Sequence, residues 1–146
     1  MKNSFVITLL LGIITLLGFT ACDQGEEIIL DNTPVEIQSY VDTHFPANGI
    51  LQVAKEVDQS VVTFEVTLEQ NIELEFNAAK EITEIDSVTE LPDSVIPAKI
   101  REYVQAKYSG QFITDWELEN GEQHVELDNG TELEFDRDDN FLRVDN

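Results

Sequence analysis

Acidic side chains alternate with apolar ones along three segments near the end of the sequence, 112–119, 122–128 and 131–136. Alternation with a period of two predicts strands that have one apolar and one acidic face. Carboxylates gathered on one surface, with a single histidine among them, attract cationic groups. The side chains predicted to share this surface are Asp115, Glu117, Glu119, His124, Glu126, Asp128, Glu132 and Glu134.

Three uses of this predicted acidic surface remain open. It can dock a basic patch of a protein partner, because complementary charge raises the association rate and the specificity. It can bind or buffer divalent cations, which favour carboxylate oxygens. It can also be a solvated surface whose charges keep an otherwise apolar sheet from aggregating.

The overall charge narrows the classes of partner. The sequence has 8 Lys and Arg residues against 30 Asp and Glu residues, a formal net charge of -22 over 146 residues. Nucleic acid and anionic lipid surfaces repel such a chain, so neither is an expected partner. With 42% hydrophobic residues, the chain still has enough apolar side chains to bury a core.

No catalytic or metal-binding motif accompanies the acidic residues. The two histidines, His44 and His124, are too few for a histidine-rich zinc site, and no phosphate-binding or dinucleotide motif occurs. The alternating oxygen donors of 136–140 suit calcium, but Phe141 stands where an EF-hand loop needs glycine. A tight acidic turn between strands is therefore the favoured interpretation. We expect no enzyme activity, no cofactor and no resident metal.

The start of the chain predicts export. Residues 1–21 have the pattern of a signal peptide, since Lys2 precedes an apolar run of about fifteen residues that is too short to span a bilayer as a helix. The small residues before Cys22, the only cysteine, resemble a bacterial lipobox, whose cysteine is acylated. Acyl chains hold a protein on a membrane, so we expect a lipid anchor in the cell envelope, on the periplasmic or surface side of the outer membrane. Residues 22–33 are expected to form an acidic tether.

Two segments carry the same apolar stripe, and Ile100 of the second lies 63 positions after Ile37 of the first. The spacing i, i+3, i+4, i+8 predicts amphipathic helices that begin near Pro34 and Pro97. The stripe residues are Ile37, Tyr40, Val41 and Phe45 in the first segment and Ile100, Tyr103, Val104 and Tyr108 in the second.

Four strands are expected after each helix. The turn sequences Asn120-Gly121 and Asn129-Gly130 favour hairpins, and such turns are too short for parallel crossovers. The predicted fold class is α+β, with two tandem repeats, 34–90 and 91–146, each made of one helix packed on an antiparallel four-stranded β-sheet. The predicted strands lie near 50–57, 61–69, 71–77 and 81–86, and near 112–119, 122–128, 131–136 and 141–145.

A family resemblance rests on the Tyr-Val pair of each helix, Tyr40-Val41 and Tyr103-Val104, and on the segment 125–136 followed by Asn140-Phe141-Leu142. With these motifs, residues 34–146 resemble the PepSY-like family of secreted Bacteroidota proteins, whose fold is similar to that of the streptomycete β-lactamase inhibitor protein. The resemblance implies a non-enzymatic binding or inhibitory module of the cell envelope, with a protein partner that the sequence does not name. A structural accessory subunit of an envelope complex is the remaining alternative.

Overall fold

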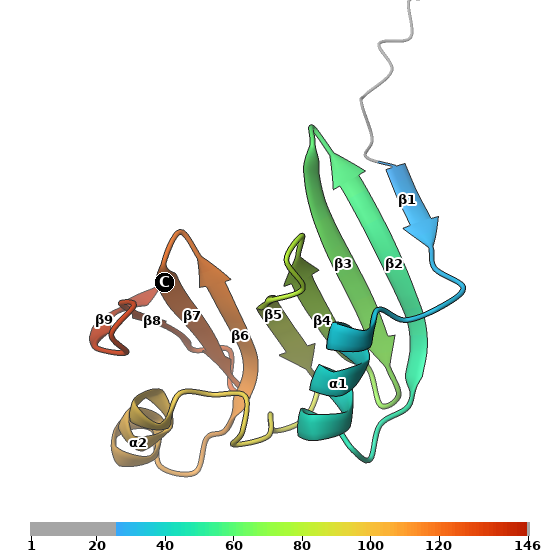
Figure 1. Cartoon of the computed structure of the whole chain (residues 1–146). Coiled ribbons are helices and arrows are strands. Elements are labelled where there is room, and N and C mark those ends of the chain that lie inside the picture. Colours follow the sequence, from blue (N-terminus) through green and yellow to red (C-terminus); the bar gives the residue numbers. More distant parts are fainter. Residues whose placement is uncertain (1–25, 146) are drawn as a thin grey trace, which may run out of the picture.

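The computed structural model describes residues 26–145, which form nine strands and two short helices (Figure 1). The predicted signal peptide and Cys22 lie outside the described residues. Neither helix in the described part is long and apolar enough to cross a membrane. In chain order the elements are β1 (Glu26–Ile29), α1 (Val35–His44), β2 (Ile50–Asp58), β3 (Val61–Leu68), β4 (Ile72–Asn77), β5 (Ile82–Ser87), α2 (Ala98–Lys107), β6 (Ile113–Glu119), β7 (Glu122–Leu127), β8 (Glu132–Phe135) and β9 (Phe141–Asp145).

All nine strands belong to one antiparallel sheet and follow the order of the chain. The prediction of two repeats, each a helix on its own four-stranded sheet, is therefore wrong. Two pairings overturn it, because β5 pairs with β6 and β1 adds a further strand along β2. The backbone N–H and C=O groups along an open strand edge have no partners within the sheet. The two pairings supply partners for these groups on β2, β5 and β6. Part of the segment expected to be a tether, 22–33, is thus an edge strand.

Both helices lie on the same face of the sheet. α1 follows Pro34, whose backbone is extended, and ends where the backbone N–H of Phe45 donates to Val41; α2 begins after Pro97 and ends in the same way. The predicted apolar stripes point into the core, where Ile37 and Ile100 are both fully buried. The helix predictions are confirmed to within a residue or two at each end.

The apolar core lies between the helices and the sheet and is continuous from β2 to β8. Each helix places a tyrosine ring edge-on against a fully buried phenylalanine of the sheet. The ring centroids of Tyr40 and Phe76 are 5.4 Å apart, and those of Tyr103 and Phe135 are 5.5 Å apart. Such contacts add to the free energy of burial. Because alternate side chains point to opposite faces, the acids of β3 to β9 lie on the face without helices.

Tight turns hold neighbouring strands in register. Asn120 and Gly121 have φ of 52° and 85°, as a type I′ turn requires, and Gly130 has φ of 78° between β7 and β8. Both predicted hairpins are confirmed by the pairing of their strands. Gln70 and Asn71 take φ of 66° and 57° at the β3–β4 turn without any glycine. This register decides which acids become neighbours.

Candidate functional site

Two rows of mainly acidic side chains cross the sheet on the face that points away from the helices, and we call the two rows together the acidic face. Strand register sets the members of a row side by side, on strands that are about 4.8 Å apart. The first row runs from β3 to β9 as Glu65, Glu75, Glu84, Glu117, His124, Glu134 and Arg143. The second row runs from β4 to β9 as Glu73, Asp86, Asp115, Glu126, Glu132 and Asp145.

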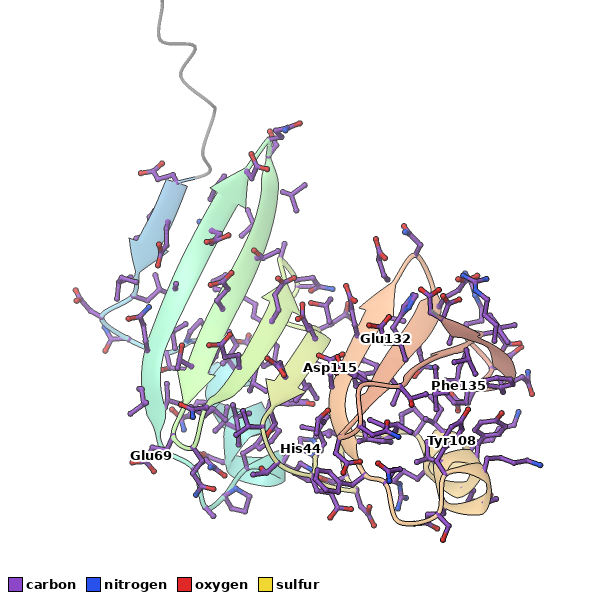
Figure 2. All side chains as sticks on the ribbon, turned by 180° about the vertical axis from the view of Figure 1, so that it is seen from behind. His44, Glu69, Tyr108, Asp115, Glu132 and Phe135 are labelled. Carbon is purple, nitrogen blue, oxygen red and sulfur yellow. The ribbon has the colours of Figure 1, made fainter. Side chains whose placement is uncertain are left out.

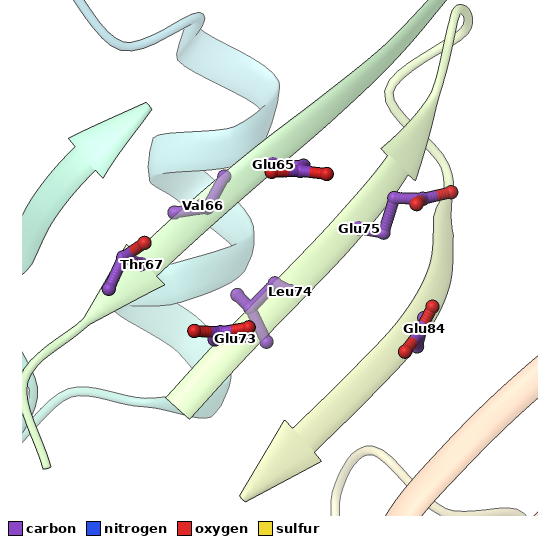
Figure 3. Close-up of a pocket in the computed structure, with 7 residues that line it drawn as sticks. All are labelled: Glu65, Val66, Thr67, Glu73, Leu74, Glu75 and Glu84. Carbon is purple, nitrogen blue, oxygen red and sulfur yellow. The ribbon is translucent and has the colours of Figure 1, made fainter. Parts of the chain in front are cut away.

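We call β1 to β5 the first half of the sheet and β6 to β9 the second half. On the first half, the acidic face forms a shallow depression of about 140 Å³. Glu65, Glu75 and Glu84 stand there on three neighbouring strands, with α1 behind the sheet (Figure 3). Burial raises the pKa of the Glu65 and Glu84 carboxyls, and the carboxylates on adjacent strands raise it further. These shifts mark a place where a cationic group is favoured.

The centre of the acidic face is Asp115, which lies between Asp86 on β5 and Glu126 on β7. Burial is the largest cause that raises the pKa of the Asp115 carboxyl from its ordinary 3.8 to about 7. Repulsion by neighbouring carboxylates acts in the same direction, because each of them disfavours a further negative charge. In decreasing order of effect, these neighbours are Glu84, Asp86, Glu117 and Glu126.

Five of the side chains predicted from the sequence line a single depression on the second half of the sheet, with a volume of about 270 Å³. Figure 2 shows two of them, Asp115 and Glu132, on the side of the molecule opposite to the view of Figure 1. The structure therefore brings these side chains together across β6, β7 and β8. The five are Asp115, Glu117, His124, Glu126 and Glu132.

The other three predicted side chains do not line this depression. Glu119 lies opposite Glu122 beside the β6–β7 turn and is exposed. Asp128 lies beyond the other end of β7, where its Oδ1 accepts the backbone N–H of Phe112 at 3.1 Å. Glu134 belongs to the first row, but its carboxylate is covered.

Within residues 26–145, Glu134 is the one charged residue that is buried, with 2% of its side chain exposed. The guanidinium of Arg143 on β9 donates to its Oε1 at 2.7 Å, while 62% of the Arg143 side chain remains exposed. The ion pair compensates the carboxylate for its loss of water. The β9 end of the first row is therefore neutralised from within the chain.

Sequence reasoning did not select the acidic face of the first half, although β3, β4 and β5 were each predicted as strands. The signal was the same alternation with a period of two that indicated the second half. The missing information was the β5–β6 pairing, which places these acids in line with those of β6. The side chains concerned are Glu65, Glu73, Glu75, Glu84 and Asp86.

The acidic segment 136–140 is a turn between β8 and β9. The side-chain amide of Asn140 donates to the Oδ2 of Asp136 at 2.9 Å, and the backbone N–H groups of Asn140 and Asp138 donate to its Oδ1 at 2.8 and 2.9 Å. These bonds lower the pKa of the Asp136 carboxyl, and the side-chain bond from Asn140 has the largest effect. The Lys99 ammonium of α2 donates to the Asp138 carbonyl at 3.0 Å and to the Asn140 side chain. These oxygens are engaged by the protein itself. In residues 26–145 no group of three or more His, Cys, Asp or Glu side chains is placed to hold a metal ion.

The family described as "Putative beta-lactamase-inhibitor-like, PepSY-like" matches residues 22–83 and 62–143 of this chain. The chain belongs to the PepSY-like family. In this PepSY-like protein, the acidic face lies on the surface of the sheet that the two helices leave free. No curated protein matches the chain.

Solved structures from Bacteroides share the fold of this PepSY-like chain. A "putative periplasmic protein of unknown function" from Bacteroides vulgatus ATCC 8482 has a TM-score of 0.78 at 28% identity, over 83% of this chain and 100% of that one. A second periplasmic protein of that organism, described as putative and of the DUF2874 family, has 0.76 at 28% identity, over 86% and 99%. A "putative calcium-regulated periplasmic protein" from Bacteroides thetaiotaomicron has 0.78 at 27% identity, over 82% and 97%.

Proposed function

We propose that this PepSY-like protein is a lipid-anchored, non-enzymatic module of the cell envelope that binds a basic protein partner on its acidic face. The observation that carries the proposal is the run of carboxylates on a face that no helix covers. The second row is acidic on every strand from β4 to β8, and the first row is acidic on every strand from β3 to β6. A partner with lysine and arginine side chains at matching spacing would relieve the repulsion within these rows. The net charge of -22 would also steer such a partner to the protein.

Other observations support the remaining parts of the proposal. The family carries the description beta-lactamase-inhibitor-like, which favours binding over catalysis. The similar Bacteroides structures are described as periplasmic, in keeping with export. Cys22 follows a signal-peptide pattern, and acylation there would hold the protein on a membrane. In cells, Cys22→Ala is expected to move the protein from the membrane fraction to the soluble fraction, and unchanged fractionation would contradict lipid anchoring.

The docking proposal is tested with envelope extract and two matched pairs of substitutions. Glu117→Lys with Glu126→Lys inverts two charges at the centre of the acidic face. Glu36→Lys with Glu102→Lys makes the same change in net charge on exposed positions of the two helices. A genuine partner is retained by the unchanged protein and by the helix variant, is lost from the face variant, and dissociates as salt rises. Retention of every captured protein by the face variant would refute docking on this face.

Divalent cations are the second candidate ligand. The similar protein from Bacteroides thetaiotaomicron is described as calcium-regulated, and carboxylate oxygens suit calcium. A ligand that binds only the folded state raises the melting temperature by mass action. Excess calcium is therefore expected to stabilise the protein if cation binding is its role, and magnesium at equal ionic strength is the control. Equal melting temperatures in calcium and in magnesium would contradict specific binding of calcium.

A further inference from the structure

The ladder between β5 and β6 is the shortest in the described sheet. It holds three residue pairs, whereas the other ladders hold four or more. Its middle pair, Ile85 and Trp116, faces the helices and is buried. Its two outer pairs face the open side, and each sets one carboxylate opposite another. They are Glu84 with Glu117 and Asp86 with Asp115.

Further carboxylates face these two pairs from both sides. On β4, Glu75 lies opposite Glu84, and Glu73 lies opposite Asp86. On β7, Glu126 lies opposite Asp115, and on β8 Glu132 lies opposite Glu126. The basic members of the two rows are His124 on β7, opposite Glu117, and Arg143 on the outer strand β9, paired with Glu134.

Repulsion therefore acts on one side of this ladder and cohesion on the other. Like charges directly opposite each other on neighbouring strands destabilise the pairing. On the helix side, Ile85 and Trp116 pack in the shared core. The backbone N–H of Leu91, between β5 and α2, donates to the carbonyl of Ile113 at 2.9 Å. The strength of the β5–β6 pairing therefore depends on how many of these carboxylates are ionised.

We propose that the β5–β6 ladder is a charge-dependent joint between the two halves of the sheet, which full ionisation of its carboxylates loosens and neutralisation tightens. Protons neutralise it at low pH. Cationic side chains of a docked partner neutralise it at higher pH, and this second part rests on the proposed function. Partner binding and pairing of the two halves are then coupled, because each favours the other.

The direction of the pH effect follows from Asp115. Its pKa is about 7 in the folded protein, against an ordinary 3.8. Between these two values the folded protein binds more protons than the unfolded chain, so the free energy of unfolding falls as pH rises and levels off above about pH 7. The effect of Asp115 on the joint is accordingly strongest at about pH 4 and below, and the joint is loosest above neutrality.

Amide hydrogen exchange, corrected for the intrinsic effect of pH, tests the joint without any partner. From about pH 5 to about pH 8.5, protection of the amides in 84–86 and 115–117 is expected to fall roughly tenfold more than protection in the β2–β3 ladder, where no two carboxylates lie opposite each other. Asp115→Asn should remove most of this difference, and Asp86→Asn serves if the first variant does not fold. Glu65→Gln, a neutralisation in the same field but within the first half, should retain it. The proposal of a joint would be wrong if protection depended equally on pH in the β5–β6 ladder and in the reference ladder. It would also be wrong if Asp115→Asn kept the full pH dependence of protection at the β5–β6 ladder.

A second arm tests the coupling with a lysine-rich peptide as the probe at about pH 8. Binding of the peptide together with slower exchange at the β5–β6 ladder supports the coupling. Binding with unchanged exchange there overturns the coupling while docking stands. Absence of binding counts against the docking function, and the pH arm then decides the joint by itself.

Discussion

Each helix is followed by four strands, and the third and fourth of these strands carry one pair of facing side chains that differs in charge between the two halves. The pair is Glu75–Glu84 on β4 and β5 and Glu134–Arg143 on β8 and β9. In the second half, Arg143 satisfies a buried carboxylate. In the first half, a second carboxylate stands at that position, and the pKa of Glu84 is raised by burial and by its acidic neighbours.

The difference follows the position of the strand in the sheet. β9 is an outer strand, where a charged side chain protects an open edge from pairing with other chains. β5 is covered by β6, so its outward residues join the acidic face. The chain thus neutralises the outer end of the first row and concentrates negative charge where the two halves meet.

The core substitutions Phe76→Ala and Phe135→Ala should give the largest effects, each lowering the free energy of unfolding by about 3–5 kcal/mol. Both rings are fully buried and contact a helix tyrosine, one in each half. Because the core is continuous, Phe76→Ala should also shift the urea transition reported by the fluorescence of Trp116, which lies in the second half. A Trp116 transition that stays in place would mean that the halves unfold separately.

Arg143→Ala should lower the free energy of unfolding by about 1–3 kcal/mol, because it leaves the Glu134 carboxylate buried without its ion pair. Urea unfolding near neutral pH measures the loss. Adding Glu134→Gln to this variant removes the buried charge and should restore part of the stability. If the double variant were no more stable than Arg143→Ala, packing of the arginine would account for the loss instead of charge.

Glu84→Arg should give the smallest effect, a gain of about 0.5–1 kcal/mol above neutral pH. The new arginine lies between Glu75 and Glu117, so it makes the first half resemble the second. Glu26→Arg, the same change in charge at an exposed position of β1, is the control. Thermal unfolding of both variants checks the prediction, and an equal gain in both would assign the effect to net charge alone.

Local patterns in the sequence predicted the elements well. The apolar stripes around Ile37 and Ile100 and the alternation around Val125 and Leu133 depend on nearest neighbours along the chain, and the core side of each element follows from them. The turn at Asn120-Gly121 was also predictable from local sequence, because asparagine and glycine tolerate the positive φ angles that a type I′ turn requires.

The pairing of strand edges was not predictable in this way. Alternation says which face a residue takes, but it does not say which edge of a strand meets which other edge. The strand β1 was missed because all four of its residues are exposed and backbone hydrogen bonds hold it. The alternation placed Glu134 on the same face as the other acids. It did not indicate that Arg143 of β9 lies opposite Glu134 and forms an ion pair with its buried carboxylate.

By itself the sequence determined the net charge and the export pattern, which depend on composition and on the first residues of the chain. It also determined the two helices, most of the strands and the face of the sheet on which the acids lie, because these depend on residues close together in the chain. Tertiary structure alone decided that the strands form one sheet and that Asp115 lies between Asp86 and Glu126. Electrostatic interaction depends on distance in space, and the β5–β6 pairing brings together carboxylates that are far apart along the chain.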